Sequence, residues 1–125
     1  MIHEEICTYE VCKLAKEKGF NLICPHYFRT KNKDLFRVFP CEDWSDIEDR
    51  INAPTQSLLQ RWLRDARAID IDVYPIFLDG ATDNREYGCQ IYAIGKSNKP
   101  FRIGYAKTYE NMLETALKYA LENLV

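Results

Sequence analysis

The hydrophobic period of this chain changes at residue 69, and this change limits its fold more than any other feature. Before it, apolar residues recur at helical spacing, whereas Ile69, Ile71 and Val73 alternate with polar side chains. The same alternation returns twice further along, and short connections of this kind join antiparallel neighbours. The pattern predicts an antiparallel meander with one apolar face, with strands at residues 69–78, 87–95 and 101–106.

Three amphipathic helices are predicted around this meander, at residues 8–18, 55–68 and 108–124. Thr8 and Thr108 are residue types that cap helix N-termini, and Gly19 is suited to the position just after a helix. A sheet with one apolar face must bury it, and the helices are the available cover.

Residues 21–53 carry a weaker pattern. Two apolar-rich segments, 21–28 and 35–39, flank the polar turn 30–34 and predict a short hairpin that can extend the meander. Residues 42–49 are acidic and are expected to form a loop or one helical turn. The fold class is therefore α+β, in the order α-(ββ)-α-βββ-α, and 125 residues suit one domain over 1–125.

Composition excludes several classes of function. The formal net charge of −2 gives no basic excess for non-specific nucleic-acid binding. No apolar run approaches the length of about 20 residues that a membrane span needs. The first residues lack the basic and apolar segments of a signal peptide, so we expect a cytoplasmic protein. Its cysteines are then expected to be free thiols: Cys7, Cys12, Cys24, Cys41 and Cys89.

Two familiar motifs are incomplete. Gly95-Lys96-Ser97 resembles the end of a phosphate-binding loop, but Gln90 stands where the first glycine is needed and Pro100 follows. Ala15 and Gly19 have helix-turn-helix spacing, but the segment that follows is rich in strand-forming residues and contains a proline. A hairpin turn and a helix C-terminus explain these residues better.

Cys24-Pro25-His26 pairs a thiol with an imidazole, which could serve a Cys–His enzyme or, with Cys41, a zinc site. Core thiols and a surface histidine are the favoured interpretation. Five carboxylates could bind a divalent ion but show no EF-hand spacing, and a solvated acidic surface is favoured for them. These are Asp43, Asp46, Asp49, Asp70 and Asp72. We therefore expect no catalytic residue, metal or cofactor.

The sharpest polar feature lies on the second predicted helix, opposite its apolar arc of leucines, Trp62 and Ala66. Arg61, Arg64 and Arg67 recur every three residues beside Gln60 and can contact phosphates or an acidic protein surface. A solvated face that pairs with nearby acids is the simpler alternative. Gln60, Arg61, Arg64 and Arg67 are the candidate partner-binding residues.

The segment 53–64, Ala-Pro-Thr-Gln-Ser-Leu-Leu-Gln-Arg-Trp-Leu-Arg, resembles a helix shared by small proteins of bacterial prophages and integrative elements of gut anaerobes. Residues 14–20 and the helix entry Thr108-Tyr109-Glu110 are also similar to that group. No activity is established for the group, so the resemblance implies a phage or mobile-element setting rather than a reaction.

Three functional hypotheses follow from these residues. The leading one is a non-enzymatic binding or accessory protein of a mobile element that acts through a protein partner. The first alternative is a nucleic-acid-binding protein that uses Arg61, Arg64 and Arg67. The second alternative is a small enzyme that uses Cys24 or His26. The residues favour no membrane partner and leave the oligomeric state open.

Overall fold

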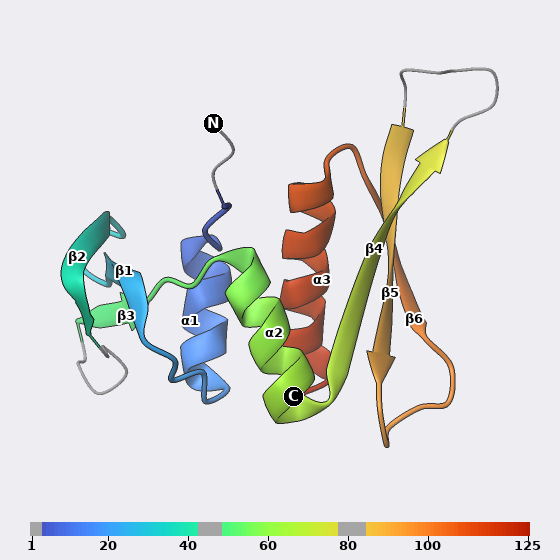
Figure 1. Cartoon of the computed structure of the whole chain (residues 1–125), viewed down its shortest axis with the longest axis horizontal. Coiled ribbons are helices and arrows are strands. Elements are labelled where there is room, and N and C mark those ends of the chain that lie inside the picture. Colours follow the sequence, from blue (N-terminus) through green and yellow to red (C-terminus); the bar gives the residue numbers. More distant parts are fainter. Residues whose placement is uncertain (1–3, 43–48, 78–84) are drawn as a thin grey trace. The chain divides into compact units, whose positions relative to one another are not determined.

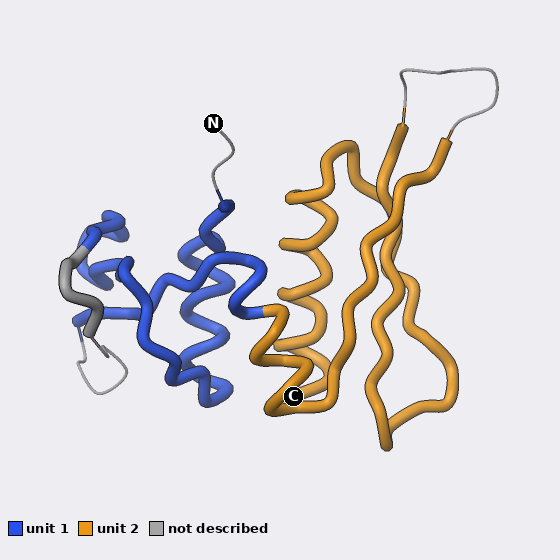
Figure 2. Tube along the Cα trace, in the orientation of Figure 1, with its two compact units in different colours: residues 1–59 blue, residues 60–125 orange. Residues whose placement is uncertain are grey.

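The structure, a computed structural model, describes residues 4–42, 49–77 and 85–125, except for the side chains of residues 38–42. These residues form helices and two three-stranded antiparallel sheets, which confirms the α+β class and the predicted order (Figure 1). The chain divides into two compact units, residues 1–59 and 60–125 (Figure 2). Each unit has its own sheet, and a single domain over 1–125 stays a prediction.

Helix α1 (Tyr9–Glu17) begins and ends where the sequence predicted. The Thr8 hydroxyl accepts a hydrogen bond from the backbone N–H of Val11 at 3.4 Å. At the other end, Gly19 has a φ of 98° and the N–H of Phe20 donates to the carbonyl of Ala15. A positive φ at this position favours glycine, and the bond satisfies a carbonyl that the helix leaves open.

The sheet of the first unit has the strand order β2-β1-β3, with β1 (Cys24–Arg29) in the centre. Proline cannot donate a ladder hydrogen bond, so it is tolerated at bulges and edges. Pro25 lies at an irregularity in the pairing of β1 with β2 (Leu35–Glu42), and Pro40 lies in β2, which is an edge strand. The predicted hairpin is therefore present, and its second strand continues past Pro40 to Glu42.

Strand β3 (Arg50–Asn52) was not predicted, because three residues are too few to show a period. It pairs antiparallel with β1. The hairpin therefore forms a separate sheet with β3 and does not extend the meander.

Helix α2 (Gln56–Arg67) includes the boundary between the two units. The Thr55 hydroxyl accepts from the N–H of Leu58 at 3.2 Å and so caps the helix. Trp62 is 6% exposed and Leu63 is fully buried. The central residues of the predicted apolar arc are therefore buried, as expected.

The second unit contains the predicted meander, formed by β4 (Ile69–Phe77), β5 (Arg85–Ala93) and β6 (Phe101–Ala106). Helix α3 (Tyr109–Asn123) packs on one face of this sheet (Figure 1). That face presents the buried residues of the alternating pattern. They are Ile69, Ile71, Cys89, Ile91 and Ala93, and α3 contributes Met112, Leu113, Ala116, Leu117, Ala120 and Leu121.

Two sequence expectations concern parts of the chain outside the described residues. They are the acidic stretch, of which residues 43–48 are not described, and the connection between the first two strands of the meander, of which residues 78–84 are not described. Within residues 4–42, 49–77 and 85–125, no helix is long and apolar enough to cross a membrane.

Trp62→Ala is expected to lower the free energy of unfolding by about 3–5 kcal/mol, because it removes a large buried side chain and leaves a cavity. Urea unfolding followed by circular dichroism measures the change. Arg61→Ala is the matched control on the exposed side of α2 and should change stability by less than about 0.5 kcal/mol. A loss below about 1 kcal/mol for Trp62→Ala would contradict its role as a core anchor.

Candidate functional site

Gln60, one of the four candidate binding residues, holds α2 against the edge of the second sheet. Its side-chain amide donates a hydrogen bond to the backbone carbonyl of Ile71 in β4 at 2.9 Å. Strand β4 lies at the edge of the sheet, where backbone groups lack a neighbouring strand. Gln60 therefore supplies a donor for an edge carbonyl and fixes the helix, rather than facing a partner.

Arg67 also packs on its own helix. Its guanidinium carbon lies 5.3 Å from the centre of the Trp62 ring. An arginine over an aromatic face is stabilised by the negative charge of the ring surface. This contact covers Trp62 at the end of α2 that leads into β4.

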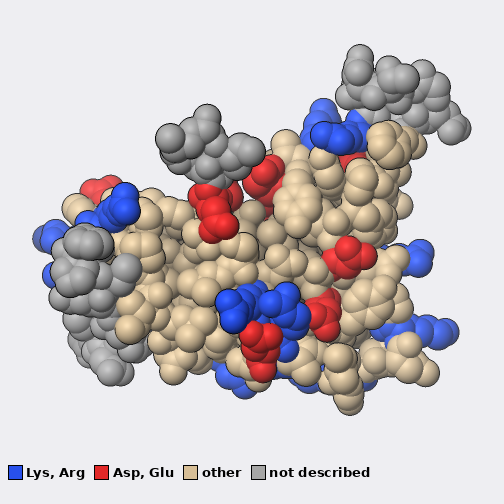
Figure 3. Space-filling view, viewed as in Figure 1, with Lys and Arg blue, Asp and Glu red and all other residues tan. Residues whose placement is uncertain are grey.

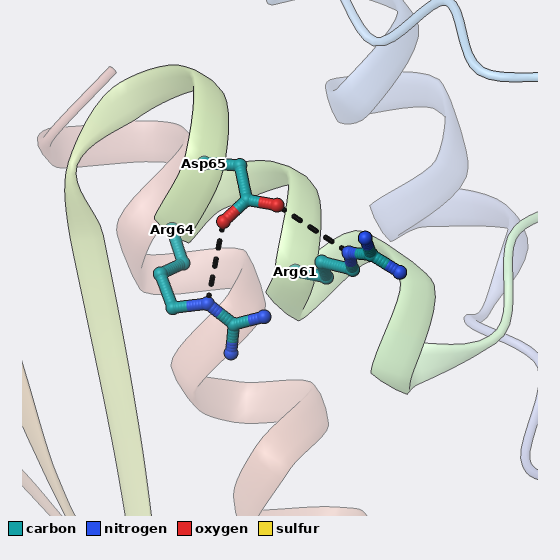
Figure 4. A network of polar contacts seen from close by, with 3 residues as sticks. All are labelled: Arg61, Arg64 and Asp65. Atoms are coloured by element: carbon teal, nitrogen blue, oxygen red, sulfur yellow. Dashed lines mark hydrogen bonds and ion pairs between the residues drawn. The ribbon is translucent and has the colours of Figure 1, made fainter.

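Three of the four candidate residues, Arg61, Arg64 and Arg67, are exposed, and Arg61 and Arg64 share one carboxylate. Their side chains are 70% and 51% exposed, and each donates through Nε to one oxygen of Asp65 at 3.4 Å (Figure 4). The Asp65 carboxylate therefore lies between the two guanidinium groups. The predicted site missed Asp65, although its position four residues after Arg61 is the spacing of a helical ion pair.

The charge of this surface is mixed. Arg61, Arg64 and Asp65 together carry a net charge of +1, and Figure 3 shows basic and acidic side chains lying side by side on the face that it presents. Ion pairs this exposed contribute little to stability, so Asp65 holds the two arginines only weakly. Another anion can therefore replace Asp65 as the partner of these arginines at little cost in free energy.

The structure gives Cys24 and His26 different environments. Cys24 is fully buried, and its thiol donates to the carbonyl of Leu22 at 3.4 Å. His26 pairs across the sheet with Arg37, beyond the irregularity at Pro25. Burial, and secondly the positive charge of Arg37, lower the pKa of His26 below its usual value. A lowered pKa disfavours the imidazolium form that would stabilise a neighbouring thiolate.

The alternative zinc site of Cys24, His26 and Cys41 lies partly outside the described residues, because the side chain of Cys41 is not among them. Within that part, no group of three His, Cys, Asp or Glu residues is arranged to hold a metal ion. Asp70 and Asp72 lie in β4, and Asp49 in a turn before β3, whereas Asp43 and Asp46 are not described.

The two incomplete motifs have structural roles. Lys96 lies in the turn between β5 and β6, where its ammonium group donates to the backbone carbonyl of Leu124. A strand rather than a helix follows this turn. After Gly19 the chain runs through residues 21–23 into β1, so the helix-turn-helix arrangement is not formed.

Basic side chains of the first unit pack on aromatic rings. Arg29 lies 4.7 Å from the centre of the Phe36 ring, and Arg50 lies 4.9 Å from that of Tyr27. These two rings are stacked at 5.5 Å, and Arg29 and Arg50 are partners in the β1–β3 register. The rings therefore accommodate two like charges that would otherwise repel across the strand pair.

Comparisons of the chain with protein-family models, with curated protein sequences and with solved structures found no match. The assignment of function therefore rests on the geometry of the described residues.

His26 is expected to titrate below about pH 6.5, the usual pKa of histidine. Because folding favours the neutral imidazole, its contribution to stability is full above the unfolded pKa and is lost as the pH falls through the lower folded value. NMR titration of the imidazole measures the pKa, with His26→Gln to assign the resonance. Arg37→Gln should raise it, and a pKa that stays at or above the usual value would contradict this environment.

The thiols are expected to react slowly in the native protein, since Cys7, Cys12, Cys24 and Cys89 are free and buried. Burial also raises the pKa of Cys89, which lowers its reactive thiolate fraction. Titration with a thiol reagent in denaturant without reductant should count all five cysteines of the sequence. A smaller count, or stoichiometric zinc by elemental analysis, would refute reduced and metal-free cysteines.

Proposed function

We propose that this chain is a non-enzymatic binding protein that acts through a protein partner, using Arg61 and Arg64 of α2 to contact acidic groups. The observation that carries this proposal is the pair of exposed guanidinium groups on either side of Asp65, 3.4 Å from its oxygens. Gln60 and Trp62 fix the helix beneath them through the carbonyl of Ile71 and through burial.

The free hydrogen-bonding capacity of the two arginines supports a binding role. Each contact with Asp65 uses Nε, and within the described residues the terminal nitrogens of Arg61 and Arg64 make no hydrogen bond. A guanidinium group has further donors in a planar fork that fits a carboxylate with two parallel bonds. A partner carboxylate can therefore bind either arginine at its terminal nitrogens without first displacing Asp65.

The charge balance favours a protein over nucleic acid. Asp65 repels a phosphate array at the centre of the site, and the chain as a whole carries a formal charge of −2. Even with all three arginines engaged, release of counterions would give a log–log salt slope no steeper than about −3. Arginine is also enriched at the centres of protein interfaces.

The setting that we propose is the cytoplasm of a bacterium that carries a prophage or integrative element. It follows from the resemblance of residues 53–64 to proteins of such elements. The partner is then encoded by the element or by its host.

Replacing both arginines, Arg61→Glu with Arg64→Glu, is expected to abolish capture of the partner, because it reverses the charge of the contact. Affinity capture from host extract, with protein and nucleic acid both analysed, measures the effect. The control is Lys99→Glu with Lys107→Glu, which makes the same change of charge at two exposed lysines of the second unit. Capture that survives the arginine change would contradict the proposal.

Asp65→Asn removes a carboxylate that repels acidic groups, so it should tighten binding to an acidic protein surface. A DNA-binding assay of the unchanged chain then separates the two kinds of anionic partner. Fluorescence binding to single-stranded and duplex DNA near physiological salt should show no submicromolar affinity. Submicromolar binding that is lost with Arg61→Glu and Arg64→Glu, in a folded protein, would replace the protein partner with nucleic acid.

A further inference from the structure

One face of the β4–β5–β6 sheet is left open when α3 covers the other. The register places Tyr74 of β4, Gly88 of β5 and Tyr105 of β6 side by side across this open face. Asp72 and Tyr92 lie on the same face, since they have the opposite parity to the buried Ile71 and Ile91. We call Asp72, Tyr74, Tyr92 and Tyr105 the tyrosine face.

Gly88 allows Tyr74 to lie across the middle of the sheet. A Cβ atom at Gly88 would stand 3.0 Å from both Cζ and the hydroxyl oxygen of Tyr74, which is tighter than most real contacts and would force the ring to shift. The missing side chain therefore makes room for the Tyr74 ring over the central strand. On the other side of Gly88, Tyr105 is 71% exposed.

Tyr92 adds a second exposed ring, oriented by a hydrogen bond on its own strand. It is 41% exposed, and its hydroxyl donates to the side-chain oxygen of Gln90 at 2.6 Å. The face is thus lined by aromatic rings of which two are substantially open to solvent. Exposed tyrosines give a large contact area at low cost in side-chain entropy, which is typical of binding surfaces.

The charged residues of this face are mainly acidic. Asp70 and Asp72 lie in β4 and Glu86 in β5, whereas Arg102 of β6 is the cation opposite Gln90. These described residues carry a net charge of −2. A face of this sign repels the phosphates of nucleic acid and attracts a cationic ligand.

The edges of the sheet are poorly suited to adding a strand. At β4, the carbonyl of Ile71 accepts the hydrogen bond from Gln60. At β6, the register shifts beside Gly104, whose φ of 100° fits a bulge. Bulges and covered groups block edge pairing, so a partner is directed to the face rather than to an edge.

From this combination we propose that the tyrosine face binds a lysine- or arginine-rich segment of a partner protein. The cationic side chains would lie over the exposed tyrosine rings, and the carboxylates of Asp70 and Asp72 would pair with them. This surface is separate from Arg61 and Arg64, which attract the opposite charge. The proposal for the tyrosine face can therefore be wrong while the proposed function is right, and the reverse is also true.

The test is a titration of the full chain with a synthetic peptide of alternating arginine and serine, ten residues long, followed by amide NMR shifts and calorimetry. The expected shifts lie in β4, β5 and β6. Tyr92→Ser with Tyr105→Ser should weaken binding about tenfold, because two cation–π contacts are lost. Tyr92→Phe with Tyr105→Phe keeps both rings and should retain the affinity, which distinguishes ring contact from a change in folding.

The charge requirement has its own control. Asp72→Lys should weaken binding at least as much, whereas Glu17→Lys makes the same change at an exposed position of α1 and should have little effect. The proposal is overturned if the peptide does not bind, if its shifts lie outside the sheet, or if serine and phenylalanine variants bind alike. Equal binding of a matched glutamate–serine peptide, or preferential binding of single-stranded RNA at this face, would also overturn it.

Discussion

The burial of one face of the β4–β5–β6 sheet by α3 is the packing interaction on which the second unit depends. Ile91 in the central strand and Leu117 in the helix are fully buried, and the register aligns Ile71 with Ile91 across the sheet. Burial of a large apolar side chain contributes about 1.5–3 kcal/mol, so this layer outweighs any ion pair on the surface. Strands β4 and β5 therefore keep strict alternation, which sends Asp72, Tyr74 and Tyr92 to the opposite face.

Burial of apolar side chains and one hydrogen bond also explain why α2 presents its arginines to solvent. Trp62 and Leu63 are buried, and Gln60 reaches the edge carbonyl of Ile71, so the rotation of the helix is fixed. The remaining positions, Arg61 and Arg64, must then face solvent. Because Asp65 lies between them, the surface carries alternating charge, which suits selective contact with another protein better than general attraction to phosphates.

Two surfaces of opposite character thus occur in one unit of the chain. The arginine pair on α2 offers donors to carboxylates, and the tyrosine face offers rings and carboxylates to cations. A binding protein with two such surfaces can hold two partners, or two regions of one partner, through contacts that do not compete.

The sequence by itself determined the elements with a strong period or a clear cap. The alternation after Ile69, the arc around Trp62 and the turn at Gly19 each follow from local chemistry, and the structure confirms all three. The exposure of Arg61 and Arg64 also followed from their position opposite that arc. Local patterns of this kind can be read because each residue's neighbours along the chain fix its environment.

Tertiary structure alone decided the rest, because it depends on pairing between distant residues. Strand β3 exists only through its ladder with β1, and the hairpin forms its own sheet because β3 takes the other side of β1. The bond from Gln60 to Ile71 engages the side chain of one predicted binding residue within the fold. Likewise, the alignment of Tyr74 and Tyr105 beside Gly88 requires the strand register, which no period within a single strand specifies.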